Sequence, residues 1–303
     1  MNIRLMISIK LLERIYRIIY RRFLRVSFLV KSSFLKERIV EFGSVRYFVS
    51  PNNSLDHLLI ERDGAYHPII SLLCESLNPE GIAIDVGANA GYWSLPLAIR
   101  FSKVMAVEAD KQNFDRLVMN IDLNEKLKSK VNAINCAISN RTGKSFLNIR
   151  RSLDGQARLN TGLSSIVVTD GHDQNSVEIN TITIDELCKD ESKPIRFVKI
   201  DVEGAESLVL EGSIGIISKD RPVFFWEAII TRENTSVVDC MNLLNEVNYK
   251  HVAINDDLHY KEIDGFADLV KLGYDIDVIS IHQDEYKDLF VNHLAEKLNA
   301  AGV

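Results

Sequence analysis

Short apolar runs alternate with stretches of helical spacing over most of the chain. Runs of four to eight mostly apolar residues, several rich in Val and Ile, are typical of strands buried on both faces of a sheet. Strands are expected at 82–85, 104–107, 131–138, 177–182, 195–200, 222–226, 249–254 and 277–281. Helices are expected at 92–100, 111–123, 204–212 and 237–247, with a short helical turn at 185–187. This alternation predicts an α/β protein with a doubly wound, mostly parallel sheet and helices on both faces.

The first 80 residues differ from this pattern. Residues 1–36 are predicted to form a basic amphipathic helix, because Lys10, Arg14, Arg17, Arg21 and Arg25 recur at steps of three or four. Such a helix either lies on an anionic membrane surface through residues 1–31 or packs on protein through its apolar face. The charges are too frequent for a membrane span. Residues 37–80 are expected to hold a hairpin at 38–49, turning at Gly43, and a lead-in helix at 65–77.

The chain is organised around residues 82–91, where an apolar run ends at Asp85 and a turn containing Gly87, Asn89 and Gly91 follows. A strand, a glycine-rich turn and a helix form the first half of a nucleotide-binding unit. The next predicted strand ends at Glu108, where a carboxylate can accept hydrogen bonds from ribose hydroxyls. Asn89 replaces the middle glycine that brings a pyrophosphate close to the helix. The turn therefore favours S-adenosylmethionine over NAD.

Composition narrows the function further. The formal net charge is -6, and residues 1–31 hold eight basic side chains against Glu13, so the rest of the chain is strongly acidic. An acidic body argues against nucleic-acid binding. The four cysteines are scattered without metal-ligand spacing, which predicts no zinc site and a reduced, cytoplasmic protein. If the N-terminal helix binds lipid, the protein would lie peripherally on the inner membrane face.

Acids also end four of the predicted strands, at Asp85, Glu108, Asp201 and Glu227. Ligands of doubly wound sheets bind at the carboxyl ends of strands, so these acids indicate a site at one sheet edge. Asp201 and Glu203 are the candidates for a general base or acceptor-orienting group. Together with Glu227 they could alternatively hold a divalent cation, although no metal site is predicted. His172 is an alternative base if the loop at 150–176 closes over the site.

The motifs resemble those of the FkbM-type S-adenosylmethionine-dependent methyltransferases. The resemblance covers about residues 80–230. It rests on 85–91, on 107–109 with Asn120 and 123–124, on 183–185, on 199–206 with 210–212, and on Pro222 with Glu227. The segment 199–206, Lys-Ile-Asp-Val-Glu-Gly-Ala-Glu, is the most specific of these. In one departure, Ala109 and Asp110 follow Glu108 where proline often follows the acid.

The resemblance implies a class I methyltransferase domain, here residues 81–290 with a tail at 291–303, built on a seven-stranded sheet whose last strand is antiparallel. It implies methyl transfer to a hydroxyl, commonly of a sugar, a glycolipid or a secondary metabolite. S-adenosyl-L-methionine would be bound by Asp85, by the turn through Gly87, Asn89 and Gly91, by Glu108 and Ala109 at the ribose, and by Cys136 and Ala137 beside the adenine. Asp201 and Glu203 would face the methyl group. The acceptor and the oligomeric state are not identified.

Two other functions stay open. An NAD-dependent oxidoreductase is disfavoured by Asn89 and by the lack of a Tyr-x-x-x-Lys pair. A catalytically inactive membrane-surface module with the same fold is disfavoured by the intact turn, Glu108 and Asp201.

Overall fold

The structure is a computed structural model that describes residues 37–50, 53–62, 64, 67, 69–149, 176–230, 235–272 and 276–301, together with three short backbone segments between 152 and 167. The predicted basic helix at 1–36 and His172 lie outside the described residues. Within the described residues, no helix is long and apolar enough to cross a bilayer.

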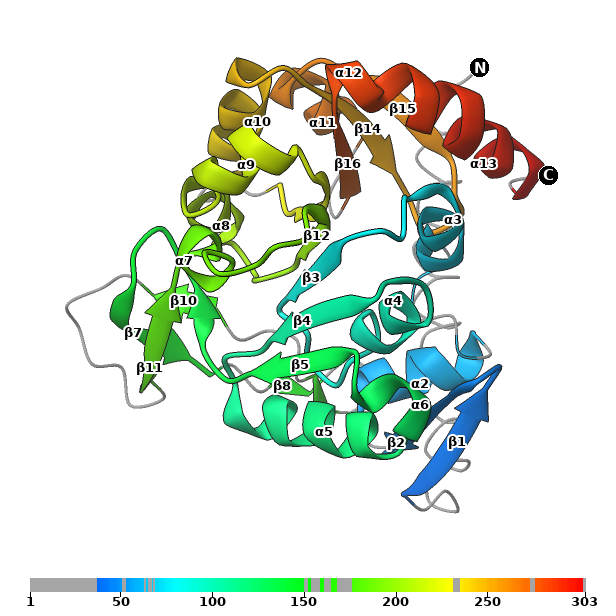
Figure 1. Ribbon diagram of the computed structural model, residues 1–303, viewed down its shortest axis with the longest axis vertical. Helices are drawn as coiled ribbons and strands as arrows, with labels where there is room; N and C mark the ends of the chain where they lie inside the picture. The colour runs from blue at the N-terminus through cyan, green and yellow to red at the C-terminus, as the bar shows by residue number, and fades with distance from the viewer. Residues whose placement is uncertain are drawn as a thin grey trace, which may run out of the picture.

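An eight-stranded sheet forms the centre of the molecule (Figure 1). Its order is β15 (Tyr260–Ile263), β14 (Tyr249–Ile254), β16 (Ile276–His282), β13 (Val223–Ala228), β12 (Ile195–Ile200), β3 (Ile82–Val86), β4 (Lys103–Val107) and β5 (Val131–Ile134). The strands from β13 to β5 are parallel, and β16, the last in the chain, is antiparallel to both of its neighbours, as expected. The sheet has eight strands rather than the expected seven, because β15 pairs on the outer side of β14.

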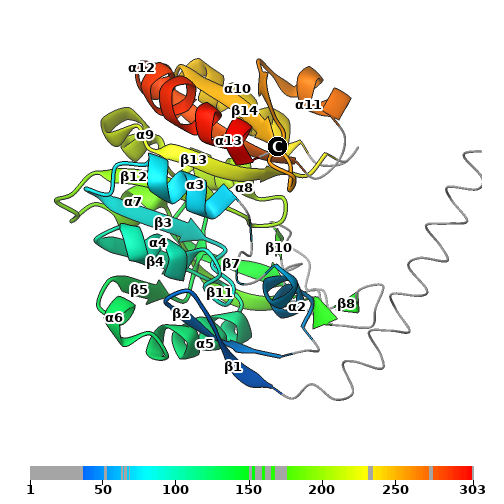
Figure 2. The same ribbon diagram turned by 90° about the vertical axis from the view of Figure 1, so that its right-hand side faces the viewer.

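Helices cover both faces of the sheet (Figures 1 and 2). One face packs against α2 (Ser54–Glu61), α3 (Ile69–Ser76), α4 (Ser94–Arg100), α5 (Lys111–Asp122), α6 (Glu125–Lys128), the π-helix η1 (Lys287–Leu294) and α13 (Ala295–Ala301). The other packs against α7 (Ile184–Leu187), α8 (Glu206–Glu211), α9 (Ile214–Asp220), α10 (Ser236–Glu246) and α11 (Phe266–Leu272). The short α12 (Gln283–Tyr286) joins β16 to η1. Alternation along β3 serves both cores, since Ile82 and Ile84 face one and Ala83 faces the other.

The expected single strand at 131–138 is divided between two sheets. After β5 the chain leaves the main sheet, and β6 (Ala137–Ile138) pairs with β11 (Ser176–Ile182) in a small sheet that also holds β7 (Gly143–Asn148) and β10 (Ser165–Val167). Asn135 marks the break, because its side-chain amide donates to the Glu108 carbonyl (2.8 Å) at the end of β4. The remaining pair, β8 (Ser152–Leu153) and β9 (Leu159–Asn160), also lies within the segment expected to be a loop.

The N-terminal hairpin of β1 (Arg38–Phe42) and β2 (Val45–Val49) forms as expected. It docks on α5, where the side-chain amide oxygens of Asn120 and Asn124 accept from the Phe48 and Arg46 amides (2.8 and 2.9 Å). Helix α2 was not expected, because its first residues read as a turn. Asn53 is in fact its N-cap, and its side chain accepts from the amides of Leu55 and Asp56.

The segment predicted as a tail at 291–303 is helical through Ala301. Leu294 and Leu298 are buried in the core on the face of α3 and α4. Lys297 also pairs with Glu75 of α3 (2.9 Å).

Gly87 makes the closest backbone approach at the sheet's carboxyl edge. Its φ is +76°, and a Cβ placed there would lie 1.9 Å from the backbone oxygen of Asp201. We expect Gly87→Ala to lower the free energy of unfolding by about 3 kcal/mol or more, because backbone from two strands must separate. Gly43→Ala is the matched control: φ is +59° but the space is open, so the cost should be about 1 kcal/mol. Urea denaturation measures both, and equal losses would contradict the close approach.

Candidate functional site

A cavity of about 250 Å³ opens at the carboxyl ends of β3, β4 and β12. Its wall combines the turn after β3, the end of β4, the start of the small sheet, and the loop after β12. The residues that matter below are Gly87, Asn89, Glu108, Ala109, Cys136, Ala137, Lys199, Asp201, Glu203 and Glu227. Six of the eight predicted cofactor residues and both predicted catalytic acids therefore line one cavity.

The turn after β3 brings polar backbone to this cavity. Asn89 has a left-handed φ of +48°, a conformation that Asn tolerates better than most residues. Its amide donates to Glu108 Oε2 (2.7 Å), and its side-chain Oδ1 is buried with no hydrogen-bond partner among the described residues. An orphaned buried acceptor beside a cavity is a position that a ligand donor can satisfy.

Glu108 is held by two backbone amides. Asn89 N–H donates to Oε2 and Asp110 N–H donates to Oε1 (2.8 Å). Burial raises the pKa of Glu108 to about 7, although these two amides act to lower it. Each carboxylate oxygen accepts more than one hydrogen bond, so hydroxyl groups in the cavity can still donate to Glu108.

Lys199 lies buried between two strand-end acids. Its Nζ is 3.4 Å from Asp85 Oδ1 and 3.2 Å from Asp201 Oδ2, and it donates to the Gly87 carbonyl (2.8 Å). Burial acts to lower the pKa of Lys199, but the two carboxylates outweigh it and the net shift is upward. The lysine therefore stays charged and joins β3 to the end of β12.

Asp85 and Gly91 do not reach the cavity wall. Asp85 is fully buried, and its Oδ2 accepts from the Ser94 hydroxyl (2.5 Å) at the start of α4. Its role in the structure is to hold Lys199 and α4. Gly91 faces inward instead, since a Cβ there would lie 2.9 Å from Leu117 of α5.

The far end of the cavity is less polar. Cys136, Ala137, Ile138 and Leu147 line it beside Ala109. Burial raises the pKa of the Cys136 thiol to about 11, so it is a neutral, apolar group at pH 7. A flat heteroaromatic ring fits this lining better than a charged group does.

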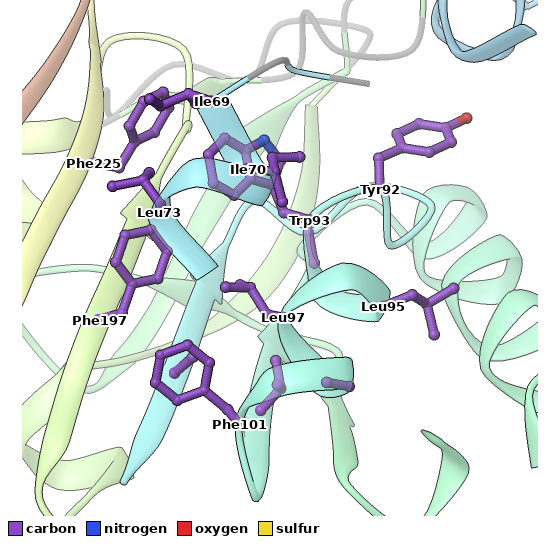
Figure 3. Packing of buried hydrophobic residues seen from close by; sticks show 14 of the residues in the cluster. Ile69, Ile70, Leu73, Tyr92, Trp93, Leu95, Leu97, Phe101, Phe197 and Phe225 are labelled. Atoms are coloured by element: carbon purple, nitrogen blue, oxygen red, sulfur yellow. The ribbon is translucent and has the colours of Figure 1, made fainter. Parts of the chain in front are cut away.

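A second cavity of about 400 Å³ adjoins the first. The two share Trp93, Lys199, Asp201 and Glu227, so these residues form the boundary between them. Trp93 packs against Phe225 with ring centroids 4.6 Å apart and stacks on Phe197 at 6.2 Å (Figure 3). It is both a core residue and part of the boundary.

Three carboxylates gather at this boundary. One oxygen from each of Asp201, Glu203 and Glu227 lies within 4.8 Å of the others. Burial and, to a smaller extent, the neighbouring acids together raise the pKa of Glu227 to about 9. Glu227 is placed inside β13 rather than just after it, which the apolar run did not indicate. Carboxylates this close either share a proton or attract a cation.

The second cavity also holds a histidine that the sequence did not single out. His67 Nδ1 accepts from the Ile69 amide (3.2 Å), so Nε2 carries the proton and donates to Asp277 Oδ2 (2.9 Å). Arg62 pairs with Asp256 beside them (2.6 Å). Both ring nitrogens of His67 are engaged, and the cluster orients groups rather than offering a free base.

Helix α2 also contributes to the site, and no motif marked it. Leu55 lines the first cavity, and buried Asp56 accepts from Tyr92, another lining residue. Arg116 of α5 donates to both oxygens of Asp56 (2.7 Å each). In the sequence, the contact of Asp56 with Tyr92 and Arg116 was marked only by an acid in the first turn of a helix capped by Asn53. That pattern is too common to predict a site.

The topology and this site define the class of protein: a doubly wound α/β enzyme fold of the methyltransferase type. Residues 85–251 match the family described as the methyltransferase FkbM domain. The match covers more than half of the chain, and the protein belongs to the FkbM methyltransferase family.

Solved structures show more distant similarity. Methyltransferase FkbM from Methylobacillus flagellatus KT is 17% identical with a TM-score of 0.46; the alignment covers 75% of this chain and 52% of that one. This chain thus spans about half the length of that protein. TYW2 from M. jannaschii, solved with AdoMet, is 14% identical (TM-score 0.42; 81% and 85% covered). An O-methyltransferase from Bacillus cereus, solved with SAH, is 14% identical (TM-score 0.41; 76% and 90% covered). No curated protein matches.

Removing Lys199 should test the charge balance at the strand ends. We expect Lys199→Met to lower the free energy of unfolding by about 3–5 kcal/mol, because Asp85 would be left buried and uncompensated. Lys128→Met is the control: Lys128 pairs with Asp122 at the surface (2.8 Å), and its loss should leave stability within experimental error. Chemical denaturation at pH 7 measures both. A tolerated Lys199→Met would contradict the expectation that buried Asp85 needs the charge of this lysine.

Proposed function

We propose that this protein is an S-adenosylmethionine-dependent O-methyltransferase that methylates a hydroxyl of a sugar, a glycolipid or a secondary metabolite. The proposal is supported above all by the paired cavities: one carries the nucleoside-binding features, and the adjoining one is lined by polar and aromatic residues. They meet at Asp201 and Glu227.

The residues of the first cavity fit this cofactor. Glu108 can accept from ribose hydroxyls, and the orphaned Asn89 Oδ1 can accept from a further donor. Gly87, with no side chain, lets the turn after β3 lie against the Asp201 backbone, so that both segments line the same cavity. Ala109, Cys136 and Ala137 offer a flat, apolar surface for adenine. Bound there, the cofactor would supply an electrophilic methyl group.

The chain's own contribution to methyl transfer is mainly positioning. An in-line displacement needs the acceptor oxygen held behind the methyl carbon, and correct placement supplies much of the acceleration. Asp201 reaches both cavities and can accept a hydrogen bond from the acceptor hydroxyl. As the new C–O bond forms, Asp201, or Glu203 beside it, would take the hydroxyl proton.

The function is tested by incubating the protein with S-adenosylmethionine labelled in the methyl group and a fractionated glycan and lipid extract. We expect label in an acid-stable product, since a methyl ether resists hydrolysis. Label trapped as a methyl ester, released by mild base, would argue for a carboxylate acceptor instead. Calorimetry with NAD is the companion measurement, and binding of NAD alone would favour an oxidoreductase.

Glu108→Ala should weaken S-adenosylmethionine binding by about 1–3 kcal/mol, because the ribose hydroxyls lose their buried acceptor. Isothermal titration calorimetry measures the change. Glu246→Ala, at an exposed position near the end of α10, is the control and should bind as the wild type does. Unchanged affinity in Glu108→Ala would remove Glu108 from the ribose site.

Asp201→Asn should slow turnover on the identified acceptor while cofactor affinity stays near that of the wild type, because the amide cannot take a proton. Glu203→Gln, compared in parallel, decides which acid carries the proton. A variant of Asp201 with full turnover would assign that role to Glu203 or to neither.

A further inference from the structure

Glu227 stands apart from the two acids beside it. Asp201 is paired with Lys199 (3.2 Å), and Glu203 also has an interaction partner. Within the described part of the chain, no hydrogen-bond donor or cation is bonded to the Glu227 carboxylate. Its side chain nevertheless lines both cavities. A partly buried carboxylate without a counter-charge costs free energy unless it is protonated or a ligand brings a positive charge.

The surroundings of Glu227 are acidic on every side. The loop after β12 brings Asp201 and Glu203, α8 brings Glu206, and β16 brings Asp277, and all four raise the pKa of Glu227. The nearby positive charges are already paired. The other titratable groups lining the two cavities around Glu227 are Arg62, His67, Tyr92, Glu108, Cys136, Lys199, Asp201, Glu203, Asp256 and Asp277.

The positively charged side chains that line the two cavities are already engaged in ion pairs. Lys199 lies between Asp85 and Asp201, and Arg62 pairs with Asp256. The boundary between the cavities therefore carries an excess of carboxyl groups that no cation in the described residues neutralises. A ligand that places a positive charge at the boundary between the cavities would neutralise part of this excess negative charge.

We propose that Glu227 recognises the positive charge of the cofactor's sulfonium, so that the site prefers S-adenosylmethionine to S-adenosylhomocysteine. This rests on the proposed function. The two ligands differ by one methyl group and one charge. When the methyl carbon leaves the sulfur for the acceptor oxygen, the sulfur keeps the electron pair of the broken bond and becomes a neutral thioether. The attraction to Glu227 then disappears, which favours exchange of the spent ligand for fresh cofactor.

The preference should depend on pH, with a sign that follows from the raised pKa. Without ligand, Glu227 with its pKa of about 9 is largely protonated at pH 7. A sulfonium stabilises the ionised form, which is a small fraction of Glu227 at pH 7 and about half of it at pH 9, so less proton release opposes binding at pH 9. The ratio of the affinity for S-adenosylmethionine to the affinity for S-adenosylhomocysteine should therefore increase as pH rises. Titration of Glu108 affects both ligands alike, because both carry the ribose.

The test is calorimetry of both ligands with the full chain at pH 7 and pH 9, in EDTA, for wild type, Glu227→Gln and the exposed control Glu246→Gln. Because Glu227 is mostly neutral at pH 7, the amide is a close mimic and should fold; circular dichroism checks this. Comparing proteins at one pH cancels the ligands' own ionisation. If the full interaction is worth about one pKa unit, wild type should favour S-adenosylmethionine, relative to Glu227→Gln, by roughly fivefold at pH 9, where about half of Glu227 is ionised, and by much less at pH 7.

The outcomes separate this inference from the function on which it rests. If neither ligand binds the wild type, the proposed function fails and this inference fails with it. If both bind and Glu227→Gln leaves their affinity ratio unchanged at both pH values, only the inference fails. Glu227→Asp, which keeps the charge, should retain the pH-dependent preference. A preference that appears only with added Mg²⁺ would also overturn the proposal, since the acids would then be holding a metal.

Discussion

The buried ion pair network around Lys199 is the constraint on which the site depends. Its ammonium group lies between Asp85 at the end of β3 and Asp201 after β12, and it donates to the Gly87 carbonyl. Without it, buried Asp85 would have no counter-charge and would repel the partly exposed Asp201 at the adjacent strand end. The two strands pair along their whole length, and at their carboxyl ends the turn after β3 lies close against the backbone of Asp201. The cavity begins where that contact ends.

Beside Lys199, the groups proposed to bind the cofactor and the acids proposed to act in the reaction lie at different ends of the first cavity. Glu108 and the less polar wall near Cys136 lie toward one end, where a nucleoside would be held by hydrogen bonds and flat contacts. Asp201 and Glu227 lie at the other end, against a second cavity that also holds Trp93. The same two acids thus line both cavities, and in the proposed reaction they would face both ligands. A charge that moves during the reaction is felt most strongly at this boundary, since it is partly shielded from water.

Much of this arrangement followed from local patterns. Apolar runs located the strands that supply the site, because strands buried on both faces must be apolar along their whole length. The turn through Gly87 and Asn89 and the acid Glu108 were recognisable because their spacing is imposed by one strand-turn-strand unit. Asp201 and Glu203 belonged to a motif specific to the family. The helix expected from residue 111 also begins where predicted, since Asp110 caps it and capping depends only on neighbouring residues.

The sequence by itself therefore determined most strands of the main sheet and several of the helices between them, the family, and most residues of the first cavity, because each is encoded within a few neighbouring positions. The tertiary structure alone decided which side chains meet across strands. It withdrew Asp85 and Gly91 from the cavity wall, split residues 131–138 between two sheets, and added β15 at the sheet edge. It also brought His67 beside Asp277 and, among the residues that the structure describes, placed no counter-charge at Glu227. These outcomes depend on distances between segments far apart in the chain, which no local pattern records.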